Sequence, residues 1–216
     1  MTSVILSFAL FALSQVGTPG PANMVLLSTG AKYGLKRALP FVFGVIVGKQ
    51  LIIWPIGIGL IGLLSNYPII FSSLKVISAG YIIWLSYKIF NLRLDITDLT
   101  GTPPGFLAGL IVHPLNPKAW GMIITGYTSF ISQEMTTLTA ILTISIILFL
   151  TQIILHPFWC WGGQRLALVV KGKNYERYLM WIFASLTLVS VFYALYQGLI
   201  KAGSLFTGLL ISFDIS

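Results

Sequence analysis

The sequence predicts an all-α polytopic membrane protein with six transmembrane helices, arranged as two inverted three-helix repeats whose first and fourth helices are broken. Three observations predict this class. Of the 216 residues, 56% are hydrophobic and 8% are charged, and the mean hydropathy of +0.92 is far above that of soluble domains. Two proline-rich interruptions of similar composition each lie inside an apolar run. Basic residues concentrate in alternate connections between the runs.

A membrane-spanning helix needs about 20 apolar residues. The chain supplies six such runs, which we place at 4–31, 38–64, 69–90, 105–131, 136–160 and 178–201. A polar segment that contains Asp95, Asp98 and the Pro103-Pro104 pair predicts a linker between two halves. The expected organisation is a first three-helix half over 1–90, a cytoplasmic linker over 91–104, a second half over 105–201 and a tail over 202–216.

The distribution of basic residues predicts the orientation in the membrane. The first, third and fifth connections carry three, two and four Lys or Arg residues, and the second and fourth carry none. The positive-inside rule then places these odd connections in the cytoplasm and both termini outside. No Lys or Arg precedes Lys32, so we expect the first run to be a retained span and not a cleaved signal. A five-span alternative, with one run lying along the surface, places the termini on opposite sides.

Two interruptions within the apolar runs predict the substrate site. Proline lacks an N–H and clashes with the preceding turn, so each interruption leaves backbone groups without helical partners. Such groups cost several kcal/mol in hydrocarbon and therefore should face a cavity or protein. Paired breaks in corresponding halves are the best pointer to a transporter's binding site, although a proline can also merely kink a helix. The predicted site residues are Pro19, Gly20, Pro21, Ala22 and Asn23 from the first break and His113, Asn116, Pro117 and Lys118 from the second.

Lys49 and Lys118 lie near the middle of the second and fourth runs. An uncompensated lysine at the bilayer centre costs about 2.5–3.5 kcal/mol, so each should face a cavity or a partner. No Asp or Glu lies at comparable depth, which favours a carboxylate or other anion as the ligand. We therefore add Lys49 to the predicted site. In the alternative interpretation, the lysines satisfy broken-helix carbonyls and never touch substrate.

The two histidines receive different predictions. His113 adjoins the second break and titrates near neutrality, so it is a candidate proton carrier. His156 is expected near the cytoplasmic end of the fifth run, as a helix-end residue. Their separation of 43 positions, one cysteine and no deep carboxylate give neither metal-ligand spacing nor a nucleophile with its base. We expect no enzymatic activity, no metal and no cofactor.

The formal charge of +8 does not predict a nucleic-acid partner, because most basic residues lie in the short connections that membrane orientation requires. Gly44-xxx-Gly48 and Gly105-xxx-Gly109 are spacings that let membrane helices approach closely. We expect them to pack helices within one chain and not to form a dimer face.

Three stretches resemble the LysE/RhtB amino-acid exporters: TPGPANMVLLSTGAKYGLKRALPFVFGVIVG (18–48), KVISAGYIIWLSYKIF (75–90) and GFLAGLIVHPLNPKAW (105–120). The resemblance implies a multi-pass protein of the bacterial inner membrane, driven by the proton gradient and often homo-oligomeric. It implies that Pro19, Gly20, Pro21, Asn116, Pro117 and Lys118 line or shape the translocation path. Many members have Asp, Asn or Gln directly after Pro-Gly-Pro, whereas this chain has Ala22, which argues against basic amino acids as substrates.

The expected function is a secondary transporter that exports small amino acids or related zwitterionic or carboxylate metabolites by proton antiport. Its expected partners are the small-molecule substrate and the lipid bilayer, and the family resemblance implies a homo-oligomer. The alternative is an ion or small-solute channel of the same architecture, because broken helices also line selectivity filters.

Overall fold

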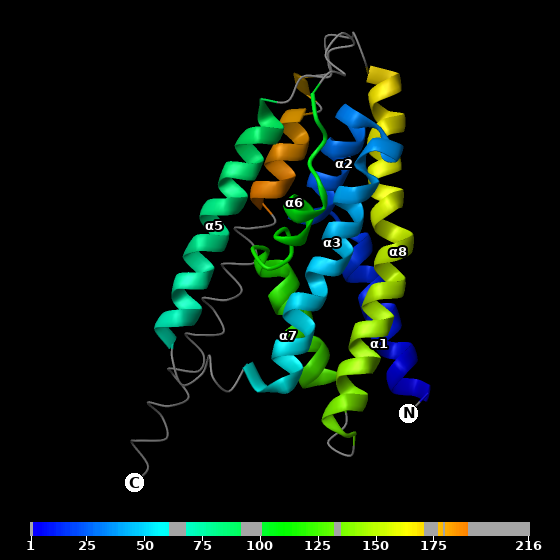
Figure 1. The fold of residues 1–216 in the computed structure, drawn as a ribbon, viewed down its shortest axis with the longest axis vertical. Coiled ribbons are helices and arrows are strands. Elements are labelled where there is room, and N and C mark those ends of the chain that lie inside the picture. Colours follow the sequence, from blue (N-terminus) through cyan, green and yellow to red (C-terminus); the bar gives the residue numbers. More distant parts are fainter. Residues whose placement is uncertain are drawn as a thin grey trace.

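The chain folds into a bundle of helices (Figure 1). The computed structural model describes residues 2–60, 68–91, 101–131, 135–170, 177–178 and 180–189, and the regular structure in these ranges is helical, as predicted. Its elements are α1 (Thr2–Gly17), α2 (Pro21–Tyr33), α3 (Leu35–Pro55), the π-helix η1 (Ile56–Leu60), α5 (Pro68–Phe90), α6 (Phe106–Leu110), α7 (Pro117–Ser129) and α8 (Thr137–Val170). A further short apolar helix covers Met180–Val189.

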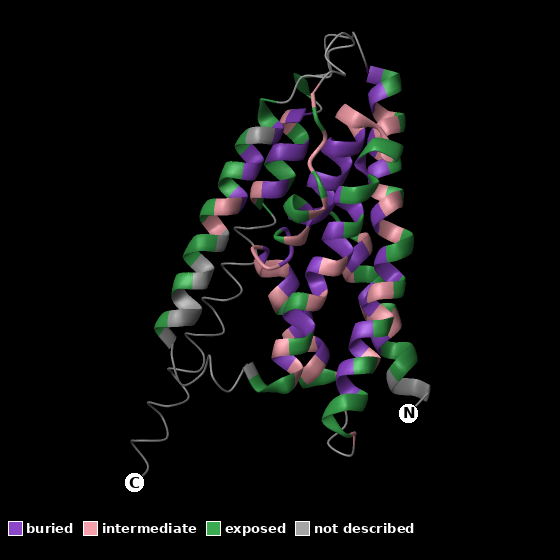
Figure 2. Cartoon of the chain, in the orientation of Figure 1, coloured by how far each residue is buried: buried purple, intermediate pink, exposed green. Residues whose placement is uncertain are grey.

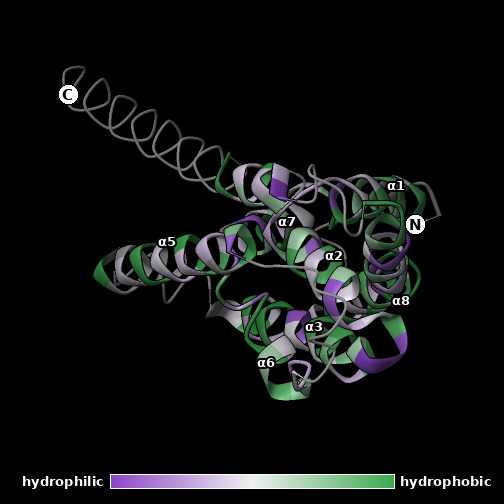
Figure 3. Cartoon of the chain, turned by 90° about the horizontal axis from the view of Figure 1, so that it is seen from above, coloured by the Kyte–Doolittle hydropathy of each residue, from purple (hydrophilic) through white to green (hydrophobic). Residues whose placement is uncertain are grey.

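The surface of the bundle is apolar in the manner of a membrane protein. Within the described residues, two helical segments are long and apolar enough to cross a bilayer, Leu35–Gly59 and Thr137–Val170. The inner face of α8 is buried, while its outer face exposes large hydrophobic side chains such as Leu150, Ile154 and Phe158 (Figure 2). α1 and α5 also expose large hydrophobic side chains such as Leu6 and Val76, and both helices contain many hydrophobic residues (Figure 3). A complete set of six spans in two repeats stays a prediction.

The first and fourth runs are broken where the prolines predict. α1 ends at Gly17 and α2 begins at Pro21, while α6 ends at Leu110 and α7 begins at Pro117. Pro21 stands at the start of α2 and Pro117 at the start of α7. At a helix start the missing N–H costs nothing, and the fixed φ of proline suits the helix. The two broken segments run in opposite directions along the bundle (Figure 1), which an inverted pair requires.

Glycines hold the broken helices against their neighbours. A Cβ on Gly44 or Gly48 of α3 would overlap the carbonyl of Phe106 or Leu110 in α6, and one on Gly109 would overlap the Phe41 carbonyl. The predicted packing within one chain is therefore found at these glycines. Nothing lies within 4 Å of a Cβ built on Gly105, so this member of the second spacing has no such role.

The same device joins the first broken helix to α8. A Cβ on Gly30 of α2 would overlap the Cys160 carbonyl, and one on Gly163 of α8 would overlap the Leu27 carbonyl. Backbone contact on this scale leaves no room for a larger side chain at either glycine. α2 therefore lies directly along α8.

The fifth helix differs from the prediction. We expected it to end near residue 160, but α8 continues without interruption to Val170. The aromatic and basic residues between positions 158 and 170 lie within this helix, and their polar groups can leave the lipid near its end.

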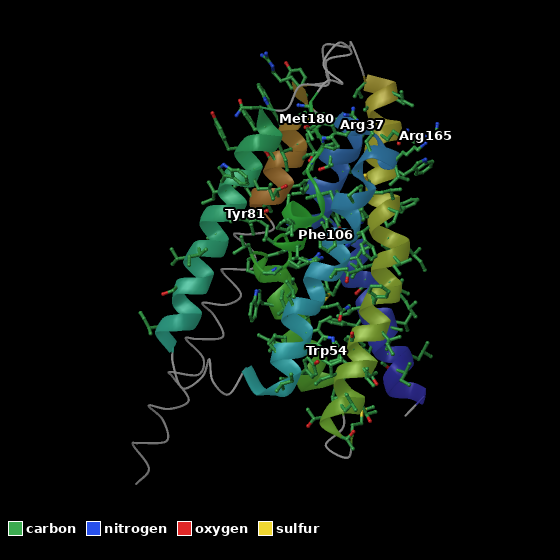
Figure 4. All side chains as sticks on the ribbon, in the orientation of Figure 1. Arg37, Trp54, Tyr81, Phe106, Arg165 and Met180 are labelled. Atoms are coloured by element: carbon green, nitrogen blue, oxygen red, sulfur yellow. The ribbon has the colours of Figure 1, made fainter. Side chains whose placement is uncertain are left out.

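Basic residues from different connections gather at one end of the bundle. Arg37 and Arg165 lie at this end, and Trp54 lies toward the other (Figure 4). Arg37 also donates a hydrogen bond from Nη2 to the Gly101 carbonyl at 3.0 Å, so the end of the predicted linker meets the first connection. This grouping is the one that the charge pattern predicts. The side of the membrane on which it lies, and the predicted tail over 202–216, which is outside the described residues, stay predictions.

Candidate functional site

A polar layer divides the apolar interior of the bundle in two. One hydrophobic cluster includes Leu26, Val42 and Cys160, and the other includes Phe8, Ile52, Ile123 and Leu148. Between the two clusters, each contributing helix carries buried polar side chains. They are Asn23 of α2, Lys49 of α3, Asn116 before α7, and Gln152 and His156 of α8, with His113 in the second break. Burying polar groups is costly, so their presence together in one layer indicates a functional site.

The first break is stabilised by Asn23. Its side-chain amide donates to the carbonyl of Val16 at 2.7 Å and to that of Thr18 at 2.8 Å, so it satisfies two carbonyls left open where α1 ends. No side chain caps the start of α2, whose N-cap residue is Gly20. The first-turn N–H groups of α2 therefore lack a side-chain acceptor.

The second break is stabilised by a different arrangement. Asn116 is the N-cap of α7, and its Oδ1 accepts from the Lys118 backbone N–H at 3.1 Å. Trp120 Nε1 donates to the Pro114 carbonyl at 2.9 Å. Here the N-cap is filled, and the Pro114 carbonyl has a side-chain donor.

Lys118 joins the two breaks. Its Nζ donates to Thr18 Oγ1 at 2.9 Å and lies 3.4 Å from the carbonyl oxygens of Thr18 and Pro19. The approach depends on Gly20, because a Cβ there would be 3.1 Å from Lys118 Cδ and 3.2 Å from Nζ. Residues about one hundred positions apart are thus in direct contact, as the paired breaks predict.

Lys49 has no such partner. Its side chain is 2% exposed and makes no hydrogen bond to any residue that the structure describes. It lines the same cavity as Lys118, and no Asp or Glu lies within the described ranges to neutralise either amine. Lys49 is buried and Lys118 is half-buried, and two amines at one cavity produce a local excess of positive charge, which favours an anionic group there.

The cavity between the breaks measures about 30 Å³. Of the predicted site residues, it is lined by Gly20, Ala22, Asn23, Lys49, His113, Asn116 and Lys118. Pro19, Pro21 and Pro117 do not line it. Pro19 contributes its carbonyl to Lys118, and the other two prolines start α2 and α7. The sequence interpretation missed Gln15, Val16, Ala119, Met122 and His156, which complete the wall.

His156 is not a helix-end residue, and that prediction was wrong. It is 1% exposed and lies within α8, which extends to Val170. Its ring stacks on that of His113, with centroids 5.5 Å apart and an interplanar angle of 25°. Gln152 lies one turn before it and contacts both rings. The spacing of Gln152 and His156 by four positions in an apolar run was the available signal, since such residues share a helix face.

These features define a class of protein. A multi-pass helical membrane protein with two broken helices that meet at a small, positively charged cavity has the architecture of a membrane translocator. The family model of the LysE type translocators matches residues 13–198, and the chain belongs to this family.

Curated relatives cover most of the chain. It is 30% identical to the cysteine/O-acetylserine efflux protein of Klebsiella pneumoniae subsp. pneumoniae, over 86% of this chain and 94% of that protein. It is 27% identical to the cysteine/O-acetylserine efflux protein of Salmonella typhi, over 89% and 100%, and 24% identical to the leucine efflux protein of an Enterobacter species, over 78% and 83%. No solved structure matches the chain.

Proposed function

We propose that this protein exports small amino acids with uncharged side chains, or closely related carboxylates, from the cytoplasm across the bacterial inner membrane. The names of its relatives, which are efflux proteins for cysteine, O-acetylserine or leucine, support this substrate class. All of these compounds carry a carboxylate and an α-ammonium group. The channel alternative has no comparable support, because the family is one of translocators.

The observation that carries the proposal is the pair of amines at one cavity. Lys49 is buried without a hydrogen-bond partner, and Lys118 approaches from the opposite break. The uncapped start of α2 adds free N–H groups and the positive end of a helix dipole. A substrate carboxylate placed among these groups would neutralise the charge that the protein leaves uncompensated.

The first break also offers acceptors for the substrate's ammonium group. The carbonyls of Thr18 and Pro19 and the hydroxyl of Thr18 already accept from the Lys118 ammonium. An α-ammonium group has the same hydrogen-bonding chemistry as a lysine side chain and would compete for these oxygens. A cationic substrate side chain would meet Lys49 and Lys118, which argues against basic amino acids.

Alternating access follows from the size of the cavity. A volume of about 30 Å³ holds a water or two, whereas small-molecule pockets measure about 300–1,000 Å³. We therefore infer that the cavity in this conformation is too small for the substrate, which enters only when the breaks separate. In our proposal the halves 1–90 and 105–201 rock against each other, driven by proton antiport, with the basic connections in the cytoplasm.

Counterflow in proteoliposomes tests this function. Vesicles preloaded with unlabelled cysteine, O-acetylserine or leucine should take up the same labelled compound transiently, and the uptake should saturate. Vesicles loaded with the corresponding amines that lack the carboxylate should show no such exchange. Absence of saturable counterflow for every uncharged amino acid would contradict the proposal.

Lys49→Met tests the carrying observation. Removing the amine should lower the apparent affinity for carboxylate substrates about tenfold, the effect of about 1.4 kcal/mol. The thermal unfolding midpoint in detergent should stay the same or rise, because an unpartnered buried charge is replaced by a methionine of similar length. Lys36→Ala, at an exposed lysine of the first connection, is the control and should change neither quantity.

A further inference from the structure

A buried polar cluster beside the cavity has no role in substrate binding as described so far. Gln152 Nε2 lies 3.1 Å from His113 Nε2 and 3.4 Å from His156 Nδ1, so one amide group contacts both imidazoles. All three side chains are at most 3% exposed. The cluster joins the second break to α8, and both histidines also line the cavity.

The amide in this cluster suits two protonation states. When Nε2 of Gln152 donates to both rings, each contacted ring nitrogen is an acceptor and both imidazoles are neutral. An imidazolium has no acceptor nitrogen, so a protonated ring instead requires the amide oxygen. A half-turn of the Gln152 amide exchanges its nitrogen for its oxygen at almost the same position. One side chain therefore fits the cluster both with and without a proton.

Two unpaired atoms indicate that the hydrogen-bonding capacity of the cluster is not filled. Gln152 Oε1 and His113 Nδ1 are buried and have no hydrogen-bond partner among the residues that the structure describes. Buried polar atoms without partners are uncommon and costly. After the half-turn of the amide, Oε1 faces the ring nitrogens, and a proton on one of them would give Oε1 the donor that it lacks.

The charged groups around the cluster connect it to the substrate. Lys49 from α3 and Lys118 from α7 line the same cavity as the two histidines, and α1 and α2 contribute the neutral side chains of Gln15 and Asn23 to its wall. Charge on an imidazole changes the electrostatic free energy of any ion held between the lysines, and the reverse is equally true. The rings are 5.5 Å apart at their centroids, so a first proton opposes a second.

We propose that His113, Gln152 and His156 form the proton-binding site of the transporter, which holds one proton shared between two imidazoles next to the substrate cavity. Gln152 is the positioning residue, and the histidines carry the proton. This inference rests on the proposed export function and adds the location of the group that couples substrate movement to pH.

Gln152→Glu tests the positioning role. The added carboxylate contacts both rings and favours the imidazolium, so the pH midpoint of counterflow should move upward by about one unit or more. Gln164→Glu is the matched control, because it makes the same change on the same helix about 18 Å farther along. Its midpoint should equal that of the unchanged chain. Equal midpoints for all three proteins would overturn the proposal.

A second measurement applies whether or not Gln152→Glu inserts. Asn places a polar group where His156 Nδ1 lies, and Gln does so for His113 Nε2, but neither binds a proton. In vesicles that contain a pH-sensitive dye, the double variant His113→Gln/His156→Asn should lose proton movement coupled to substrate. Persistent coupled proton movement would overturn the proposal.

The unchanged chain separates this proposal from the export function. Saturable counterflow that does not vary between pH 5 and pH 9 would overturn the proposed proton site and would still support the export function. No counterflow at any pH would remove the export function, and the proton site with it. Counterflow with a single pH midpoint is the result that supports both.

Discussion

The two breaks interrupt their helices with similar residues but end with opposite chemistry. In the first, Asn23 donates backward to the carbonyls of α1, and the start of α2 has no side-chain cap. In the second, Asn116 caps α7, and Lys118 extends its charge out of the break. The first break therefore presents acceptors and free amides, while the second presents a cation.

This difference explains why the breaks meet. Lys118 finds its hydrogen-bond acceptors in the first break, and Gly20 leaves the space for its side chain. Two identical breaks would present the same groups to each other and would have no such complementarity. In our account, substrate binding replaces the contact between Lys118 and the first break. The substrate carboxylate then binds Lys118, and the substrate ammonium group binds the carbonyls of the first break.

Removing the Lys118 ammonium group should have the largest effect on substrate affinity. Lys118→Ala deletes the only side chain that hydrogen-bonds from one break to the other among the described residues, and hydrogen bonds to charged groups contribute about 1.5–3 kcal/mol. We expect the apparent substrate affinity in counterflow to fall about 10- to 100-fold. Membrane insertion, measured by yield and monodispersity in detergent, should be unchanged. Normal counterflow by this variant would remove Lys118 from the site.

Removing Asn23 should destabilise the first break more than any other single truncation there. Asn23→Ala removes the side-chain donor of the buried Val16 carbonyl, at about 1–3 kcal/mol for an unsatisfied buried group, and leaves the Thr18 carbonyl with only the longer contact to Lys118 Nζ. The thermal unfolding midpoint in detergent should fall by several degrees. Asn23→Asp is the informative companion, because an ionised carboxylate cannot donate to these carbonyls. An unchanged midpoint in both variants would mean that α1 and α2 are held together by packing alone.

Placing a carboxylate in the first break should change the substrate selectivity, because it offsets the positive charge that the second break presents. Ala22 is 5% exposed and lines the cavity, so Ala22→Asp puts a negative charge beside Lys118 and Lys49. Exchange of uncharged amino acids should weaken about tenfold, and exchange of basic amino acids should become measurable. Ala22→Asn supplies the matched neutral control. The same substrate profile for both variants would show that position 22 serves packing.

Removing the cap of the second break should have the smallest effect. Asn116→Ala costs the N-cap of α7, which is about 1 kcal/mol. The apparent affinity should fall about fivefold through the displaced Lys118 backbone. Asn116→Ser, which keeps a capping oxygen, should restore most of the loss. If serine does not restore transport, Asn116 contacts the substrate directly and is not only a cap.

The sequence was sufficient to find the breaks because proline and glycine act locally. Pro21 and Pro117 start their half-helices in the structure where a missing N–H requires it, and the small-residue spacing at Gly44 and Gly48 packs against α6. Deep lysines were also recognisable, because charge is expensive in an apolar run wherever the neighbouring helices lie.

The remainder of the site depends on long-range packing that local patterns do not specify. The contact of His156 with His113 depends on the register of α8 against the second break, two segments that are far apart in the sequence. The helix end predicted near residue 160 concealed the role of His156. Gln152 carries no local signal beyond its position one turn before that histidine.

The most direct test of the central claim is substrate protection at the cavity wall. In a Cys160→Ser background, Ala22→Cys places one thiol between the breaks, and Thr102→Cys places one in the exposed segment before α6. We predict that a transported amino acid slows alkylation of the Ala22→Cys protein in proportion to its saturation of counterflow, and that alkylation of the Thr102→Cys protein is unaffected. If saturating substrate does not change the alkylation rate at position 22, the claim that the binding site lies between the breaks is contradicted.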